Sequence, residues 1–170
     1  MSTMSAAEAP RSNITGFLLI AMGSAVAVLL LILAVPYYAG SSARIASLYT
    51  NVAGPADRIL AADLKAYGVN RLRNLAAAKS DLSNEVKAET SFDSQLGNIT
   101  FPPAADPHAD QLTALDAKRI ALIKLQLKAP SLRKLRALDS QVQAASAAVD
   151  AQIKIMRADL GLPAVSGGLY

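Results

Sequence analysis

GFLLIAMGSAVAVLLLILAVPYYAG, residues 16–40, is the stretch that decides how this chain is organised. It overlaps a run of 22 residues, Ile14 to Val35, that contains no charged side chain. A helix rises about 1.5 Å per residue, so this run would be roughly 33 Å long, enough to cross a hydrocarbon core of ~30 Å. We therefore predict a transmembrane anchor over residues 14–38.

The first alternative is a signal peptide that is removed after export. A cleavable signal has an apolar region of about 7–15 residues, followed by small residues at the cleavage site. Here Tyr37 would occupy the first small position of a cut after Ala39. The pair Tyr37 and Tyr38 instead suits the headgroup zone at the end of a retained membrane helix. An uncleaved anchor is the favoured interpretation.

The second alternative rests on a resemblance to a family. GFLLI followed by AVPYY resembles the N-terminus of type IV pilins, which implies a long apolar helix and a β-rich head. That family would place a Glu at Ala21 and a basic residue directly before Gly16, and this sequence has neither. The remainder of the chain reads as helix, so a pilin-like protein ranks third among the interpretations.

Small side chains cluster inside the predicted anchor, at Ala21, Gly23, Ser24 and Ala27. Gly23 and Ala27 stand four residues apart, a spacing that lets two membrane helices approach closely. We expect this face to pack against a partner helix, although small residues are also common in membrane helices generally.

The flanks of the anchor predict its orientation. The polar tail, residues 1–13, carries Arg11 and Glu8, while Arg44 follows on the other side, so the basic residues are nearly balanced. A short tail before the first apolar segment is the layout of a signal-anchor. We expect the N-terminus inside, and the rest of the chain outside, the plasma (inner) membrane.

The rest of the chain predicts helices with no strands. The final helix is the clearest, because apolar residues recur in steps of three and four and Gly161 and Pro163 follow as stop signals. The apolar positions of this helix are Leu135, Leu138, Val142, Ala145, Val149, Ile153, Met156 and Leu160. The expected helices are 43–51, ended by Gly54-Pro55; about 40 residues from Pro55 to between Thr90 and Leu96; 107–128; and 131–160, capped by Ser131.

The predicted fold is all-α, with one N-terminal transmembrane helix followed by a bundle of three or four long antiparallel helices. The bundle spans residues 41–163, and residues 164–170 form a short tail. The FPP loop and the helix end RADLGLP resemble small membrane-anchored or exported helical proteins of actinobacteria, mostly without an assigned activity. That resemblance implies a location in the cell envelope.

The sequence offers no catalytic signature and no cofactor motif. The chain has no Cys, which excludes thiolate metal sites and thiol nucleophiles. The single histidine, His108, lies between Asp106 and Asp110, but a metal usually needs three or four ligands. We expect these residues to complement a helix start and predict no metal site. Few aromatic residues accompany the net charge of +4, so nucleic acid is not an expected partner.

Basic residues dominate the segment from Lys118 to Arg136, where seven occur without an intervening acid. Clustered cations near a helix start suit an anionic lipid headgroup or an acidic partner, although a solvated turn with the same composition is the simpler interpretation. If the long helix from Pro55 leads away from the membrane, the turn at 128–131 faces the bilayer. The predicted contact residues are Lys124, Lys128, Arg133, Lys134 and Arg136.

These features favour a non-enzymatic accessory or scaffold subunit of a membrane protein complex in a bacterial envelope, such as a lipid transporter or a respiratory assembly. The alternative is a free-standing envelope sensor, or a helical domain that binds a lipid or other ligand. A stoichiometric membrane partner would indicate the first, and a lone protein with bound lipid would indicate the second.

Overall fold

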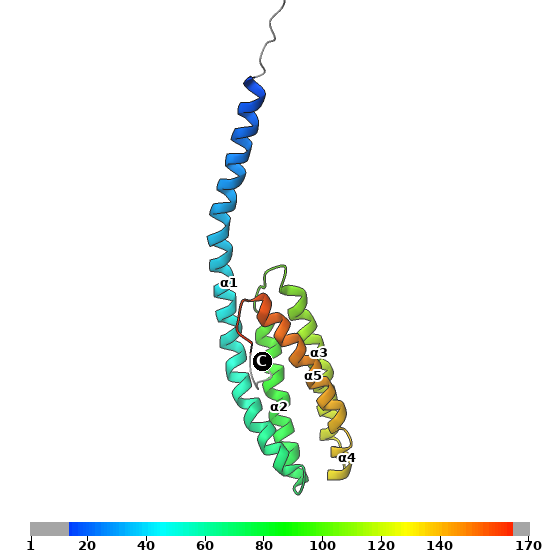
Figure 1. Cartoon of the computed structure of the whole chain (residues 1–170). Coiled ribbons are helices and arrows are strands. Elements are labelled where there is room, and N and C mark those ends of the chain that lie inside the picture. The colour runs from blue at the N-terminus through cyan, green and yellow to red at the C-terminus, as the bar shows by residue number, and fades with distance from the viewer. Residues whose placement is uncertain (1–13, 165–170) are drawn as a thin grey trace, which may run out of the picture. The chain divides into compact units, whose positions relative to one another are not determined.

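The structure is a computed structural model that describes the backbone of residues 14–164 and the side chains of residues 41–164. Within these residues every regular element is a helix. The helices are, in chain order, α1 (Ile14–Asn70), α2 (Leu75–Leu96), α3 (Asp106–Leu127), α4 (Leu132–Arg136) and α5 (Asp139–Asp159) (Figure 1). The predictions of an all-α chain and of a helical bundle are confirmed.

The chain divides into two compact units, Met1–Gly40 and Ser41–Tyr170. The second unit holds the bundle, in which residues 41–70 of α1 pack with α2, α3 and α5. Among the residues with described side chains, no helix is long and apolar enough to cross a membrane. The backbone of the predicted anchor, residues 14–38, is helical and forms part of α1. The side chains of the anchor lie outside the described residues. The tail at 1–13 and residues 165–170 also lie outside the described part.

Helix α1 passes through Gly54 and Pro55 without a break, so the predicted helix end and new start at this point are wrong. A proline inside a helix removes one backbone hydrogen bond and normally breaks or kinks the helix. Here Ala53, Ala56 and Leu60 are buried in the core, whereas Pro55 is exposed. Burial of one face of α1 therefore outweighs the local preference of Pro55.

The chain reverses instead at residues 71–74, which the sequence interpretation placed inside one long helix. Asn74 caps α2, because its side-chain oxygen accepts a hydrogen bond from the Ala77 N–H at 3.0 Å. The Asn70 amide donates to Asp81 Oδ2 at 2.8 Å and ties the two helices together beside the turn. The expected helix of about 40 residues is thus the last part of α1 followed by the antiparallel helix α2. The loop after α2, residues 97–105, therefore lies at the Ser41 end of the bundle.

The last predicted helix is also divided in two, into α4 and α5. Asp139 begins α5, where its carboxylate complements the positive helix end and accepts a hydrogen bond from Gln126 at 2.8 Å. The signals predicted at the two ends of this segment are confirmed. At its start, Ser131 Oγ accepts a hydrogen bond from the Lys134 N–H at 3.3 Å. Gly161 adopts φ +67°, and the Leu162 N–H closes the helix end on Arg157 O at 2.8 Å.

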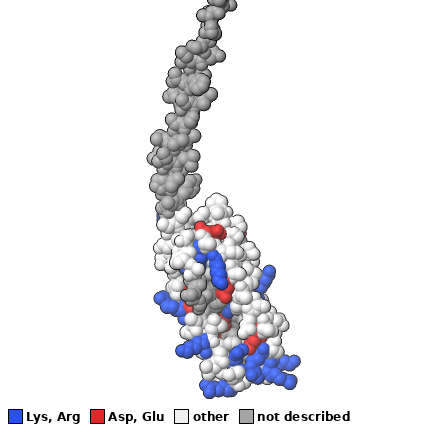
Figure 2. All heavy atoms as spheres, viewed as in Figure 1, with Lys and Arg blue, Asp and Glu red and all other residues white. Residues whose placement is uncertain are grey.

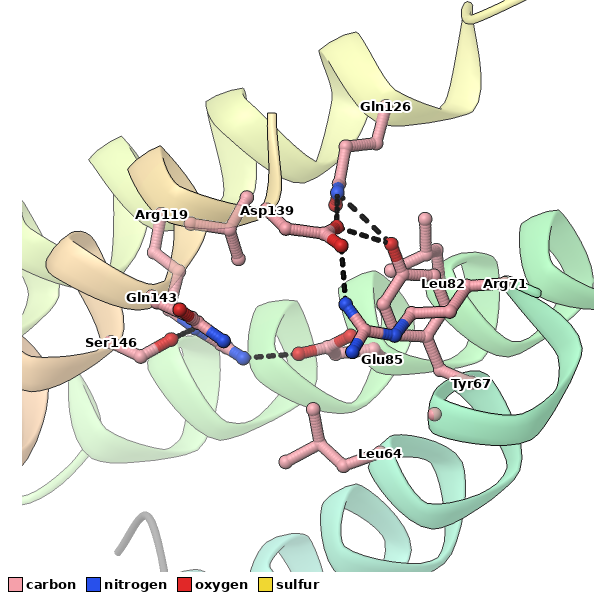
Figure 3. A pocket seen from close by; sticks show the side chains of 12 residues that line it. Leu64, Tyr67, Arg71, Leu82, Glu85, Arg119, Gln126, Asp139, Gln143 and Ser146 are labelled. Carbon is pink, nitrogen blue, oxygen red and sulfur yellow. Dashed lines mark hydrogen bonds and ion pairs between the residues drawn. The ribbon is translucent and has the colours of Figure 1, made fainter. Parts of the chain in front are cut away.

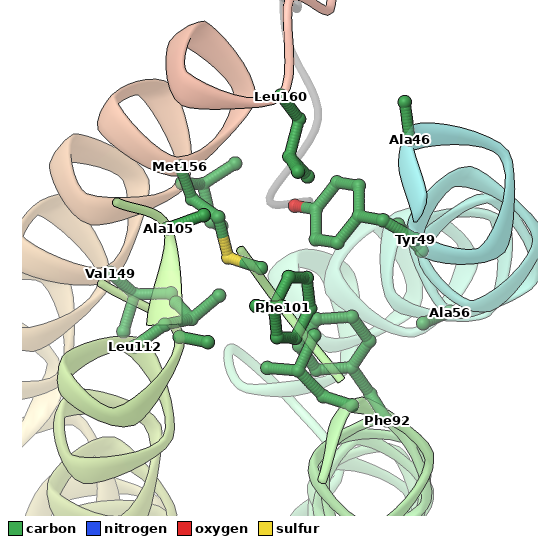
Figure 4. Close-up of a cluster of buried hydrophobic side chains, with 14 of the residues drawn as sticks. Ala46, Tyr49, Ala56, Phe92, Phe101, Ala105, Leu112, Val149, Met156 and Leu160 are labelled. Atoms are coloured by element: carbon green, nitrogen blue, oxygen red, sulfur yellow. The ribbon is translucent and has the colours of Figure 1, made fainter. Parts of the chain in front are cut away.

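An apolar core fills the end of the bundle near Ser41 (Figure 4). Tyr49 of α1, Phe92 of α2, Leu112 of α3 and Met156 of α5 are fully buried there, and Phe101 from the loop at 97–105 closes the end. The predicted α5 positions from Val149 to Leu160 belong to this core. A second, smaller apolar cluster lies toward the other end, and its buried members are Ala78, Leu82, Ile123, Ala129 and Leu135.

Replacing Pro55 tests whether α1 is continuous. In a helix interior, Pro55→Ala restores a backbone hydrogen bond, so we expect the free energy of unfolding to rise by about 1–2 kcal/mol after allowing for the more flexible unfolded chain. Pro107→Ala is the matched control, because Pro107 lies in the first turn of α3, where proline is well tolerated. Equal or lower stability of Pro55→Ala in chemical denaturation would indicate that a helix starts at Pro55.

Candidate functional site

The basic residues predicted to contact an anionic surface are all exposed, and they gather at the end of the bundle opposite Ser41 (Figures 1 and 2). The expectation that this turn faces the bilayer rested on one long helix from Pro55, and the structure divides that helix at residues 71–74. Since α1 continues to Asn70, the loop at 97–105 returns to the Ser41 end, where Asn98 and Thr100 line a shallow surface pocket together with Ser41. The basic residues at the opposite end are Lys124, Lys128, Arg133, Lys134 and Arg136.

Arg119 belongs to the same basic run but is only 1% exposed. It forms ion pairs with Glu85 and Glu89, both on α2, and its Nε donates to Ser146 Oγ of α5 at 2.7 Å. Burial raises the pKa of Glu85, against the lowering effect of the Arg119 guanidinium. Sequence analysis missed this buried group, which joins α2, α3 and α5 in the middle of the bundle.

A second pair of acids lies between α2 and α3. Asp93 shares a hydrogen bond with Asp116, and Asp116 is fully buried. Burial, followed by repulsion from Asp116, raises the pKa of Asp93 to about 7. The carboxyl group of Asp93 therefore keeps its proton up to about neutral pH.

Asp139 is the centre of a third polar group near the α4 end. Its Oδ1 accepts hydrogen bonds from the Tyr67 hydroxyl and from Gln126 Nε2, each at 2.8 Å, and its Oδ2 pairs with Arg71. Gln126 Nε2 also lies 3.0 Å from the Tyr67 oxygen. Burial, together with Asp139, raises the pKa of Tyr67, so the hydroxyl remains a donor.

A half-open cavity of about 200 Å³ lies between these polar groups (Figure 3). We call it the polar cleft. Helices α1, α2, α3 and α5 all contribute to its walls, which combine ionic, amide and aliphatic side chains. The residues that line it are Leu64, Tyr67, Gly68, Arg71, Leu82, Glu85, Arg119, Gln126, Asp139, Val142, Gln143 and Ser146.

His108 lies in the first turn of α3, as expected from the sequence. Gln152 Nε2 lies 3.1 Å from His108 Nδ1 and donates to the His108 carbonyl at 3.0 Å. Asp159 Oδ2 is 3.6 Å from the other ring nitrogen. No group of three potential metal ligands occurs among the described side chains.

Helix α1 carries apolar residues on a second face, which the bundle leaves largely uncovered. We call this face the outer stripe. Its members follow alternating steps of four and three residues, the spacing of a helix–helix seam. Leu48, Ile59 and Val69 are 43%, 50% and 47% exposed. The outer stripe consists of Leu48, Val52, Pro55, Ile59, Ala62, Ala66 and Val69.

One edge of the outer stripe is basic. Arg44, Arg58 and Lys65 are exposed and lie seven or fourteen residues apart, so they follow the same edge of α1. The opposite edge holds Tyr49 and Ala56, which are buried in the core, and the half-buried Asp63. The predicted packing residues of the anchor, Ala21, Gly23, Ser24 and Ala27, lie outside the described side chains.

A scan against protein-family models found no match, and searches of curated proteins and of solved structures found no significant match to this chain. Function is therefore inferred from the chain's own side chains.

The Asp93–Asp116 pair predicts a pH-dependent stability. Because the folded pKa of Asp93 exceeds its ordinary value near 4, the stability linked to its proton is complete below pH 4 and is lost as the pH rises through about 7. We expect Asp93→Asn, which stays neutral, to reduce the loss of unfolding free energy between pH 5 and pH 8 by about 1–2 kcal/mol, allowing for solvent screening.

Denaturation at the two pH values provides the measurement. Asp110→Asn, on the exposed surface of α3, should keep the wild-type dependence. An unchanged pH dependence in Asp93→Asn would show that Asp93 is ionised throughout this range.

Proposed function

We propose that this chain is a single-pass membrane protein and a non-enzymatic accessory or scaffold subunit of a bacterial envelope complex, such as a lipid transporter or a respiratory assembly. The observation that carries the proposal is the outer stripe of α1. The same helix contains the uncharged run from Ile14 to Val35 and continues into the bundle. There it leaves the apolar side chains of Leu48, Ile59 and Val69 exposed. An exposed apolar face with the spacing of a helix seam supports a helical partner.

The charged edge indicates what kind of helix would bind. Arg44, Arg58 and Lys65 would face a partner along one side of the seam. In an antiparallel pair of two copies these basic edges would face each other and repel. In a parallel pair each would face the edge that holds Tyr49 and Ala56, which the bundle buries. We therefore propose a different protein, with a helix that carries acidic residues beside its apolar positions.

The predicted anchor supports the same partner. Continued toward the N-terminus, the steps of three and four residues in the outer stripe pass through Ile45 and Ser41 and include Ala27 and Ser24. In the sequence, the same three- and four-residue pattern therefore joins the predicted packing residues to the outer stripe.

The basic end of the bundle fits a protein contact better than contact with lipid. About 30 residues of α1 separate Ser41 from Asn70, or roughly 45 Å along the helix. The surface potential of an anionic bilayer falls off over a Debye length of ~8 Å at physiological salt. The end of the bundle opposite Ser41, where the basic residues gather, therefore lies many Debye lengths from the point at which the proposed anchor joins the bundle. These residues are Lys124, Lys128, Arg133, Lys134 and Arg136. We assign these residues to an acidic surface of the complex.

Two other functions have less support than the accessory-subunit role. A pilin-like role is not favoured, because the described residues form no strand that could build a β-rich head. A ligand-binding role is supported by the polar cleft, and its consequences are developed in the next section.

The proposal predicts a retained anchor and an external bundle. Intact mass measurement of the mature membrane protein should include residues before Gly40. Protease added to bacterial spheroplasts should digest the bundle, because the N-terminus is proposed to be inside. A bundle that is protected in spheroplasts but digested in inverted vesicles would reverse this orientation.

The proposal also predicts that Ile59→Lys weakens partner binding. A charge at the centre of the seam must be desolvated on binding, so we expect recovery of a stoichiometric membrane partner to fall about tenfold in detergent copurification. Stability should change by less than about 0.5 kcal/mol, because Ile59 is 50% exposed.

Ile155→Lys on α5 is the matched control, since Ile155 is similarly exposed at 44% but lies outside the outer stripe. Gly23→Leu with Ala27→Leu should preserve insertion while also loosening the complex. Wild-type recovery of the partner with Ile59→Lys would exclude the outer stripe as the interface.

A further inference from the structure

The polar cleft contains polar atoms whose hydrogen-bonding capacity the protein does not use. Gln126 is 1% exposed, and its amide nitrogen contacts Tyr67, Asp139 and the Leu135 carbonyl. Among the described residues, none donates a hydrogen bond to its Oε1. Arg71 pairs with Asp139 through Nη1, while its buried Nε has no acceptor within the described part of the chain. Since buried polar atoms are normally paired, the cleft offers one acceptor and one donor to a bound molecule.

The ionic side chains that line the cleft are balanced in number, and the carboxyl group of Glu89, which also pairs with Arg119, is buried behind the lining. Two guanidinium groups, from Arg71 and Arg119, accompany the carboxyl groups of Glu85 and Asp139. A ligand with a net charge would disturb this balance in a partly desolvated site, at a cost of free energy. The cleft therefore favours a ligand with no net charge but with separate donor and acceptor groups.

The charges and walls of the cleft are arranged for a compact molecule. Arg71 and Asp139 are directly paired, so a positive and a negative group stand side by side (Figure 3). Leu64, Leu82 and Val142 supply aliphatic surface around the same space. A cavity volume of about 200 Å³ admits a small molecule of the size of valine or leucine.

We propose that the polar cleft binds a small zwitterion of the α-amino-acid class, with its carboxylate at Arg71 and its ammonium group at Gln126 Oε1 and Asp139. An α-amino acid carries its two charged groups on the same carbon atom, so they are as close together as the adjacent Arg71 and Asp139 require. An apolar side chain of the ligand packs against Leu64, Leu82 and Val142. The site goes beyond the partner surface on α1 and does not depend on it, because the outer stripe and the cleft are lined by different residues.

Gly68 allows the site to be blocked without harming the fold. It lines the cleft, and a Cβ at this position would meet no atom within 4 Å. Gly68→Leu should therefore fill the cleft and also strengthen α1, because glycine is a poor helix former. Ala61→Leu is the matched control, since Ala61 is exposed two helical turns earlier on α1 and does not line the cleft.

The experiment is differential scanning calorimetry of the full chain in detergent, with L-valine, L-leucine, L-isoleucine or L-proline added singly. We expect at least one of them to raise Tm by about 4 °C when present at ten times its Kd, in wild type and in Ala61→Leu. Gly68→Leu should show no shift, although its own Tm is equal to or above that of wild type.

Two analogues of the amino acid test the need for both charges. The amide and the N-acetyl derivative of the active amino acid each lack one charge and should raise Tm by less than a quarter as much. The proposal is overturned if none of the four amino acids raises Tm, if the analogues act equally, or if Gly68→Leu responds like wild type. Because the purified chain is used, these outcomes are independent of copurification of a membrane partner.

Discussion

The ion pairs of Arg119 with Glu85 and Glu89 are the constraint on which the rest of the bundle depends. Removing these charges from water costs several kcal/mol per ion, which is recovered only when the partners keep a defined geometry. One guanidinium thereby fixes α3 against α2 and, through Ser146, against α5. This arrangement of the helices places the apolar core on the Ser41 side of the ionic group. The polar cleft, bounded by Asp139, lies on the opposite side of the same group.

Local signals explain which parts of the fold were predictable. The boundaries of α3, the Ser131 cap and the Gly161 stop each depend on a few neighbouring residues, and all three were predicted correctly. The continuous helix through Pro55 was not, because burial of α1 against distant helices outweighs the proline. The cleft was missed because Glu85 and Glu89 look like surface residues. They do, however, follow the three- and four-residue steps of the buried positions Leu82, Phe92 and Leu96. The proposed anchor and its packing residues remain predictions from the sequence.

Helix α1 contributes residues to the core and to both proposed binding sites. Its inner face is buried in the core, its outer stripe is proposed to bind a partner helix, and Tyr67 and Arg71 near its end reach the polar cleft (Figure 3). A small molecule bound there would contact four helices at once and would thus favour the assembled bundle over looser states. In the proposed role, the chain would bind a partner helix along α1 and a small molecule in the polar cleft of the same bundle.

The most direct test of the ionic constraint is the free energy of unfolding of Arg119→Met. Loss of the guanidinium leaves two buried carboxyl groups without a cation, so the predicted decrease is about 3–5 kcal/mol, and adding Glu85→Gln and Glu89→Gln should restore part of it. Lys118→Met, which removes an exposed cation from the adjacent position, should have little effect. A decrease below about 1 kcal/mol in Arg119→Met would contradict the central place of this ion-paired group in the fold.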